Sequence, residues 1–230
     1  MLDDIKQEVL KANLDLVAHG LVLFTWGNAS MYDERSGLVV IKPSGVSYET
    51  LTAADMVVVD MDGRKVEGKY NPSSDTPTHI EIYRAFDKIR SVVHTHSKWA
   101  TSWAQACRPI PALGTTHADN FFGEIPCTRS LTEDEIRGEY EKNTGLVIIE
   151  TFREKGIDPV AVGAAVVANH GPFSWGTSCA KAVENAAVME YAAEMACITL
   201  GLNPRAFIPG ALLEKHYLRK HGEKAYYGQK

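Results

Sequence analysis

The stretch Ser91-Val92-Val93-His94-Thr95-His96 decides the fold class. Its β-branched residues predict a short, buried strand. Apolar residues at helical spacing precede this stretch at 78–86 and follow it at 99–106, so we expect a helix on either side of the strand. A strand between two helices, in a chain where both kinds of element alternate loosely, predicts an α/β domain with helices covering a central sheet.

Patterns elsewhere in the chain agree with this class. We expect helices over 2–19 and 180–200, and strands over 21–25, 38–41, 56–60, 65–70, 147–150 and 164–168. The pair Asp62-Gly63 favours a hairpin turn, so the sheet should be at least partly antiparallel. Since no repeat, linker or low-complexity tract interrupts the pattern, we expect a single domain spanning 1–230.

Composition excludes several classes of protein. The chain has 230 residues with Lys+Arg 24 against Asp+Glu 29, a formal net charge of −5, which argues against a nucleic-acid partner or an anionic membrane surface. The longest apolar stretch, 160–168, is too short to span a membrane. Four cysteines without a C-x-x-C pair, and no secretory signal, predict reduced thiols in a cytoplasmic protein.

Histidines provide the clearest chemical signal. His94 and His96 are two residues apart, so a strand would direct both imidazoles to the same side, as a divalent metal site needs. Such a short pattern is equally compatible with half-exposed polar residues of no function. His170 adds a third imidazole at the mouth of a buried strand, just before Gly171-Pro172. Three histidines leave one coordination position open, as in catalytic sites, and Asp75 could close it in the resting state.

Two other enzyme classes with an H-x-H pair fit poorly. Metallo-β-lactamase-like hydrolases extend the pair to H-x-H-x-D-H, whereas Ser97-Lys98-Trp99 follows His96 here. Amidohydrolase barrels carry the pair on their first strand, but here it lies in mid-chain and the chain is short for such a barrel. Both readings are therefore disfavoured.

Small donors and one lysine suggest a phosphate pocket. Lys42-Pro43-Ser44-Gly45 combines a cation, a hydroxyl and a glycine, and Asn28 and Ser73-Ser74 add further donors on loops. Neither the P-loop pattern nor a Rossmann glycine fingerprint is present in the sequence. Each segment alone is typical of an ordinary turn, and only together do they indicate phosphate binding.

Taken in order, the motifs resemble the L-ribulose-5-phosphate 4-epimerase family, within the class II aldolase/epimerase/adducin superfamily. The resemblance covers nearly the whole chain. It rests on Thr25-Trp26-Gly27-Asn28, Ile41-Lys42-Pro43-Ser44-Gly45, Pro72-Ser73-Ser74-Asp75, His94-Thr95-His96-Ser97, Gly114-Thr115-Thr116-His117-Ala118-Asp119, Ile125-Pro126-Cys127-Thr128-Arg129, His170-Gly171-Pro172-Phe173 and Lys224-Ala225-Tyr226-Tyr227-Gly228-Gln229. It implies a three-layer α/β/α sandwich around a largely antiparallel central sheet, and a C4 homotetramer in which the tail, about 212–230, contributes to a neighbouring subunit's site.

The resemblance also implies roles for individual residues. His94, His96, His170 and Asp75 match metal ligands, with Zn2+ the usual ion and Mn2+ or Co2+ as alternatives. Asp119 and Tyr227 match an acid/base pair, with Tyr227 reaching into a neighbour's site. Asn120 follows Asp119 where the family commonly has an aromatic residue, which changes the packing expected behind Asp119. The phosphate-binding positions are Asn28, Lys42, Ser44, Gly45, Ser73 and Ser74, and further polar site residues are Thr115, Glu141 and His216.

The implied activity is the interconversion of L-ribulose 5-phosphate and D-xylulose 5-phosphate, a small phosphorylated ketopentose being the substrate. Carbon 4 is not α to the carbonyl, so cleavage of the C3–C4 bond, rotation of the aldehyde fragment and re-formation of the bond would invert it. A metal would stabilise the enediolate. Two alternatives remain: a class II aldolase of the L-fuculose-phosphate type, which has a glutamate near the position of Asp75, and a non-catalytic adducin-like module.

Overall fold

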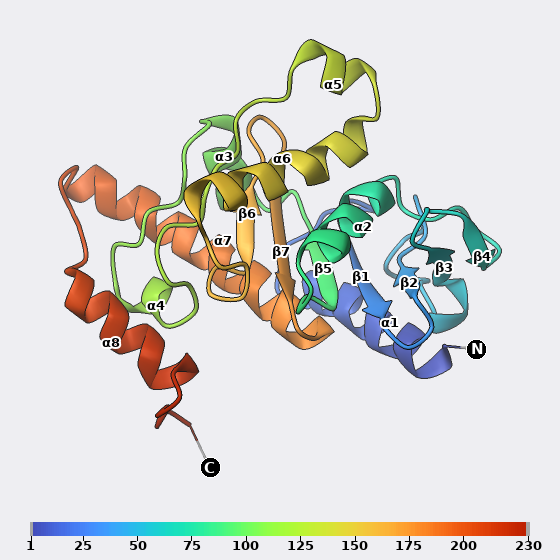
Figure 1. Cartoon of the computed structure of the whole chain (residues 1–230), viewed down its shortest axis with the longest axis horizontal. Coiled ribbons are helices and arrows are strands. Elements are labelled where there is room, and N and C mark those ends of the chain that lie inside the picture. The colour runs from blue at the N-terminus through green and yellow to red at the C-terminus, as the bar shows by residue number, and fades with distance from the viewer. Residues whose placement is uncertain (1, 229–230) are drawn as a thin grey trace.

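A computed structural model describes residues 2–228 of the chain (Figure 1). In this part of the chain, seven strands form one sheet in the order β4-β3-β2-β1-β5-β7-β6. Every pair of neighbouring strands is antiparallel, which confirms the predicted sheet type. The strands are β1 Asn28–Asp33, β2 Leu38–Ile41, β3 Val57–Asp60, β4 Lys65–Glu67, β5 Ser91–His94, β6 Ala164–Val166 and β7 Pro172–Gly176.

Helices cover both faces of the sheet (Figure 1). Helices α1 and α7 pack on one face, and α2 and α6 lie together on the other, while α8 packs against α4 at one end of the molecule. The helices are α1 Asp3–Ala18, α2 Thr76–Ala85, α3 Lys98–Gln105, α4 Thr115–Ala118, α5 Glu133–Arg137, α6 Tyr140–Lys155, α7 Cys179–Leu202 and α8 Gly210–His221, with a short 3-10 helix over Ala53–Asp55.

Strand β5 shows why the chain forms three layers. Val92 packs into the core beneath α2 and α6, whereas the next residue, Val93, packs into a second core beneath α1 and α7. The strands β2 and β3 alternate in the same way, because successive side chains of a strand point to opposite faces. The two cores confirm the three-layer α/β/α sandwich.

Two expected strands are wrong. The 21–25 segment is a loop in which Leu23 and Phe24 are 63% and 79% exposed, and β1 begins only at Asn28. The 147–150 segment lies within α6, where the apolar residues at 147–149 are buried toward the sheet and α2. A short apolar run has no periodicity that separates a buried strand from the buried turn of a helix, and the prediction failed for that reason.

Gly27 brings the start of β1 close to the end of β5. Its φ is +77°, in the left-handed region, and a Cβ atom there would lie 2.9 Å from the carbonyl oxygen of His94. Only glycine fits both constraints without strain. The start of β1 therefore lies beside the end of β5. The loops that carry most of the predicted site residues gather at this edge of the sheet. None of the helices in residues 2–228 is long and apolar enough to cross a membrane.

Candidate active site

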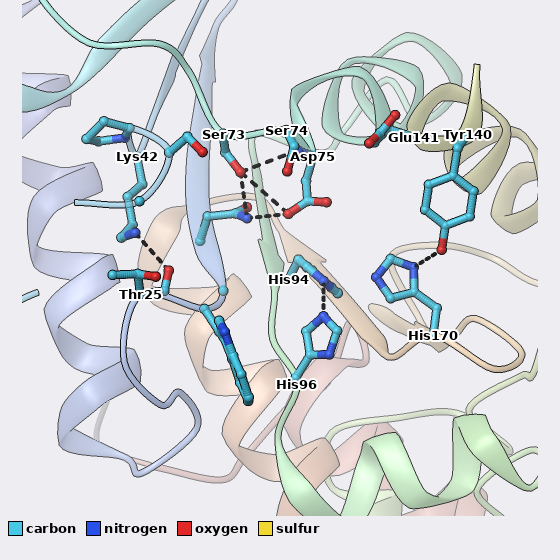
Figure 2. Close-up of a pocket in the computed structure, with 16 residues that line it drawn as sticks. Thr25, Lys42, Ser73, Ser74, Asp75, His94, His96, Tyr140, Glu141 and His170 are labelled. Carbon is cyan, nitrogen blue, oxygen red and sulfur yellow. Dashed lines mark hydrogen bonds between the residues drawn. The ribbon is translucent and has the colours of Figure 1, made fainter. Parts of the chain in front are cut away.

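A cavity of about 530 Å³ opens at this edge of the sheet (Figure 2). This volume falls in the ordinary range for a small-molecule site. The cavity has a histidine-rich end and an end lined by Lys42 and short polar residues. Its lining is Thr25, Trp26, Gly27, Asn28, Lys42, Pro43, Ser44, Gly45, Ser73, Ser74, Asp75, His94, His96, Tyr140, Glu141 and His170.

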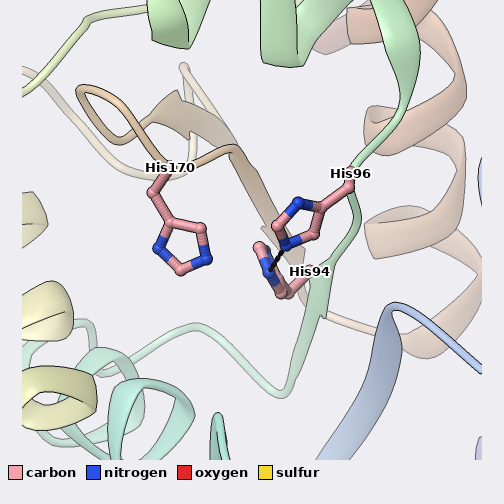
Figure 3. A group of neighbouring side chains, drawn as sticks. All are labelled: His94, His96 and His170. Atoms are coloured by element: carbon pink, nitrogen blue, oxygen red, sulfur yellow. Dashed lines mark hydrogen bonds between the residues drawn. The ribbon is translucent and has the colours of Figure 1, made fainter.

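Three imidazoles converge at the first end (Figure 3). His94 ends β5, His96 follows it, and His170 lies in the turn between β6 and β7, with one ligand nitrogen from each within 4.8 Å of the others. The Nε2 atoms of His94 and His96 are 3.1 Å apart. Two imidazole nitrogens on one tetrahedral zinc ion would be roughly 3.3 Å apart, since Zn–N bonds are about 2.0–2.1 Å long. The spacing therefore suits two ligands of one ion.

The protonation of these rings also suits a metal. His94 Nδ1 lies 3.0 Å from the carbonyl oxygen of Pro172, which can only accept, so in the neutral ring the lone pair is on Nε2, the nitrogen that faces His96. Burial, together with the neighbouring His94 and His96, lowers the pKa of His170 to about 3. Burial likewise lowers the pKa of His96. Neutral imidazoles at neutral pH are the form that binds metal ions.

Asp75 lies in the same cavity, beside the histidines. Burial alone would raise the pKa of its carboxyl, but the nearby His94 and His79 and a hydrogen bond from Asn28 hold that pKa below its usual value. The Asn28 side chain donates to Asp75 Oδ2 over 2.7 Å. Asp75 is therefore an anion beside the histidine cluster, oriented by Asn28.

Glu190 of α7 fixes the chain just beyond His96. Its two carboxylate oxygens accept from the backbone amides of Trp99 and Ala100, at 2.8 and 2.9 Å. These amides belong to the first turn of α3, where unpaired N–H groups favour a carboxylate. The helix start, and with it the loop carrying His96, is thus tied to the helix behind the sheet.

Lys42 dominates the other end of the cavity. It is 1% exposed, and its ammonium donates to the carbonyl oxygen of Thr25 over 3.2 Å (Figure 2). Burial lowers its pKa to about 8. A buried ammonium has three donors, so the one bond to Thr25 leaves capacity for an anionic ligand.

Backbone pairing brings the polar loops next to Lys42. The Ser73 amide donates to the Lys42 carbonyl over 3.1 Å, and the Ser44 amide donates to the Asn71 carbonyl over 3.0 Å. Helix α2 begins directly after Asp75, so its N-terminus adjoins Ser73 and Ser74. A cation, hydroxyls and a helix N-terminus around one space are the groups that bind phosphate in proteins.

We expect the affinity for a phosphorylated ligand to fall as the pH rises through about 8, because Lys42 is charged below its pKa and neutral above it. The KM for a phosphorylated substrate should be flat from about pH 7 to 8 and then rise by up to about tenfold per pH unit. Steady-state kinetics of the wild type and of Lys42→Met check this. The variant should have a high KM with no such rise, and a slope that persists in it would assign the titration to another group.

A second polar cluster, which we call the α8 cluster, consists of Asp119, His216, Arg219 and Tyr227. Arg219 Nη2 donates to both Asp119 carboxylate oxygens, at 2.8 and 3.0 Å, and His216 Nδ1 lies 2.9 Å from Asp119 Oδ1. The Tyr227 ring stacks on the Arg219 guanidinium, 4.9 Å away. Burial would raise the pKa of Asp119, but Arg219 and His216 hold it below its usual range. Gln229 and Lys230, at the end of the predicted tail, lie outside the described residues.

Within one chain, the predicted site residues fall into two groups. The α8 cluster is not part of the cavity lining, and neither is Thr115, the first residue of α4. Asn120 is 7% exposed and donates to Glu184 of α7 over 3.0 Å, which accounts for a polar residue behind Asp119. The cavity brings together Asn28, Lys42, Ser44, Gly45, Ser73, Ser74, Asp75, His94, His96, Glu141 and His170.

Five cavity residues were not predicted as site residues (Thr25, Trp26, Gly27, Pro43 and Tyr140), and two of them, Trp26 and Tyr140, lie against the histidines. The Tyr140 hydroxyl lies 3.2 Å from His170 Nδ1, and the Trp26 ring lies 6.3 Å from that of His96. Trp26 belongs to a segment already noted for Asn28, and Tyr140 directly precedes Glu141. Proximity to those residues was the only signal, since a lone aromatic residue has no spacing pattern of its own.

The three-layer fold, the histidine cluster and the polar loops around Lys42 define a protein of the class II aldolase type. The sequence matches the Class II Aldolase and Adducin N-terminal domain family over residues 7–197, and the chain belongs to this family. It is 58% identical over 230 residues to "L-ribulose-5-phosphate 4-epimerase UlaF" of Salmonella paratyphi B, covering 100% of both chains. The same protein of Salmonella typhi is also 58% identical, again over the full length of both.

Solved structures agree on the fold. An L-fuculose 1-phosphate aldolase superposes with a TM-score of 0.77 at 26% identity, covering 93% of this chain and 94% of that one. YgbL from Escherichia coli, described as a putative aldolase/epimerase/decarboxylase, gives a TM-score of 0.73 at 22% identity, covering 93% and 97%. The second similarity establishes the fold alone.

Proposed function

We propose that this chain is an L-ribulose-5-phosphate 4-epimerase, which interconverts L-ribulose 5-phosphate and D-xylulose 5-phosphate by retro-aldol cleavage. The observation that carries the proposal is one cavity with the histidine cluster at one end and the buried Lys42 at the other. Its relatives at 58% identity over the full length are named for this reaction. Such a cavity suits a short ketose phosphate with its phosphate at one end and its carbonyl at the other.

The two ends of the cavity have different tasks in this proposal. Lys42, Ser44, Gly45, Ser73, Ser74 and Asn28 hold the phosphate, so that the aldehyde fragment stays bound when the C3–C4 bond breaks. Rotation of the held fragment presents its other face, and the bond re-forms with carbon 4 inverted. His94, His96 and His170, with Asp75 beside them, would hold a divalent ion, and that ion would supply a Lewis acid for the charge that develops on the ketone side. Three imidazoles favour zinc, with Mn2+ or Co2+ as alternatives.

Cleavage also needs a base at the C4 hydroxyl, and the opposite face needs a second group. Asp119 and Tyr227 are the candidates. Asp119 is held in its ionised form by Arg219 and His216, as a base requires. In one chain these residues lie in the α8 cluster rather than in the cavity lining. We therefore propose that the α8 cluster of one subunit completes the cavity of another, with Thr115 on the same side and Glu141 on the cavity side.

This arrangement needs an oligomer. We propose that the whole chain, 1–230, acts as one domain within a C4 homotetramer, in which the segment of about 212–230 reaches a neighbour's site. The apolar residues exposed along α7 and beyond it support a further protein contact: Tyr191 is 59%, Ile198 52%, Leu202 84% and Phe207 77% exposed. We also propose a cytoplasmic location, since all four cysteines are free.

An assay for the conversion of L-ribulose 5-phosphate to D-xylulose 5-phosphate, with and without a chelator, tests the proposal. We expect turnover that a chelator abolishes and that added zinc or another divalent ion restores. Net release of an aldehyde with little epimer would favour the aldolase, for which the structural similarity to an L-fuculose 1-phosphate aldolase is the supporting observation. A protein that binds no divalent ion and turns over neither substrate would be an adducin-like module instead.

A further inference from the structure

We propose that Tyr48 is a positioning residue for the phosphate end of the cavity, because it holds both the Lys42 ammonium and the turn that carries Asn28. The inference rests on the proposed function, since it assigns Tyr48 a task in binding the phosphate of the substrate. Tyr48 lies outside the cavity lining, behind Lys42. It would act through other residues rather than by touching the ligand.

Tyr48 contacts both the Lys42 ammonium and the turn before β1. Its side chain is buried, with the residue 6% exposed, and its ring centre lies 4.6 Å from Lys42 Nζ. Its hydroxyl lies 2.9 Å from the carbonyl oxygens of both Trp26 and Gly27. Burial raises the pKa of Tyr48, so the hydroxyl remains a donor at every working pH. One side chain thus joins the segment after β2 to the turn before β1.

The Tyr48 ring stabilises the charged form of Lys42. No carboxylate forms an ion pair with Lys42 among residues 2–228, and the contacts of its ammonium are the Thr25 carbonyl and the Tyr48 ring. An unpaired buried cation is costly, and an aromatic face offsets part of that cost by a cation–π interaction. The Tyr48 ring therefore keeps Lys42 charged and in place before a phosphate arrives.

The turn depends on the hydroxyl of Tyr48. Gly27 has a φ of +77°, and the next residue, Asn28, donates from its side chain to Ser73 and Asp75. Because the single phenol proton is shared between the Trp26 and Gly27 carbonyl oxygens, the hydroxyl sets where Asn28 enters the cavity. The two parts of Tyr48 therefore have separable tasks: the ring acts on Lys42, and the hydroxyl acts on the turn.

Two variants of the metal-loaded enzyme separate these tasks. Tyr48→Phe keeps the ring, and we expect it to raise the KM for L-ribulose 5-phosphate about fivefold, the effect of one hydrogen bond of about 1 kcal/mol. Tyr48→Leu removes the ring as well, and we expect a rise of about 30-fold or more. The inhibition constant of inorganic phosphate should rise by the same factors, while kcat stays within about twofold and the metal content is unchanged. Tyr83→Phe is the matched control, because it loses a buried hydroxyl bonded to Ser30 over 2.7 Å and should leave both constants unchanged.

The outcomes are distinct. Unchanged constants in both Tyr48 variants, or a fall in kcat and melting temperature without a change in KM, would reduce Tyr48 to a packing residue. A wild-type protein that binds inorganic phosphate without epimerising the sugar would overturn the proposed function instead. The Tyr48 variants would then be compared with the wild type by their dissociation constants for inorganic phosphate, measured by calorimetry. We expect the same fold-changes in these constants. A wild type that binds no phosphate overturns both.

Discussion

The His170→Ala variant will lose epimerisation by about a thousandfold or more, because a Lewis acid contributes several kcal/mol to such a reaction and each 1.4 kcal/mol is about tenfold in rate. His170 supplies one of three converging imidazoles, and the remaining pair cannot hold an ion as tightly. Metal content after dialysis, and the dissociation constant for Zn2+ from competition with a chromophoric chelator, provide readouts that do not depend on activity.

Two further variants show whether the cluster acts as a metal site. Tyr140→Phe removes the hydroxyl 3.2 Å from His170 Nδ1 and should weaken metal binding by about 10- to 100-fold, as loss of a ligand's outer hydrogen-bond partner does. His19→Ala changes an exposed histidine just after α1 and should leave metal content and turnover unchanged. Full zinc affinity in His170→Ala would show that the histidines hold no metal together.

The sequence predicted the parts of this protein that depend on short-range pattern. Short β-branched runs at β2, β3 and β5, alternating with helical patterns, indicated a sheet covered by helices. The two-residue spacing of His94 and His96 indicated that their rings converge, as they do in the structure. It failed where a short apolar run is ambiguous, as in the part of α6 taken for a strand. The loop before β1 was also mistaken for a strand, because its apolar run is typical of a buried strand although Leu23 and Phe24 are exposed in the structure.

The contacts of Tyr48 and Tyr140 in the site could not be predicted from the sequence, because they join residues that lie far apart in the chain. Tyr48 lies 21 and 22 residues from the carbonyls that it holds, and Tyr140 lies 30 residues from His170. No local spacing links such partners, since the tertiary fold alone brings them together. The resemblance named Asp119 and Tyr227, but their joint separation from the cavity lining becomes visible only in three dimensions.

Because the α8 cluster lies outside the cavity lining of its own chain, we expect each active site to be shared between two subunits. Tyr227→Phe should keep its metal but lose about 100- to 10,000-fold in turnover, the usual contribution of a positioned acid or base. If the α8 cluster serves a neighbour's cavity, co-expression of Tyr227→Phe with His170→Ala will restore activity. A working site then takes its histidines from the first variant and its tyrosine from the second. With equal, random mixing in a closed ring, about a quarter of the sites receive both intact parts.

A matched co-expression makes the experiment decisive. Wild-type chains mixed equally with chains that carry both substitutions should also retain about a quarter of the activity if each site is shared between neighbours. If each site lies within one chain, this second mixture retains about a half and the first mixture recovers nothing. Differently tagged chains, purified in succession, establish that mixed oligomers have formed. Recovery near zero in the first mixture and near a half in the second would therefore place Tyr227 within its own subunit's site. Full activity of the Tyr227→Phe variant alone would place Tyr227 outside the mechanism.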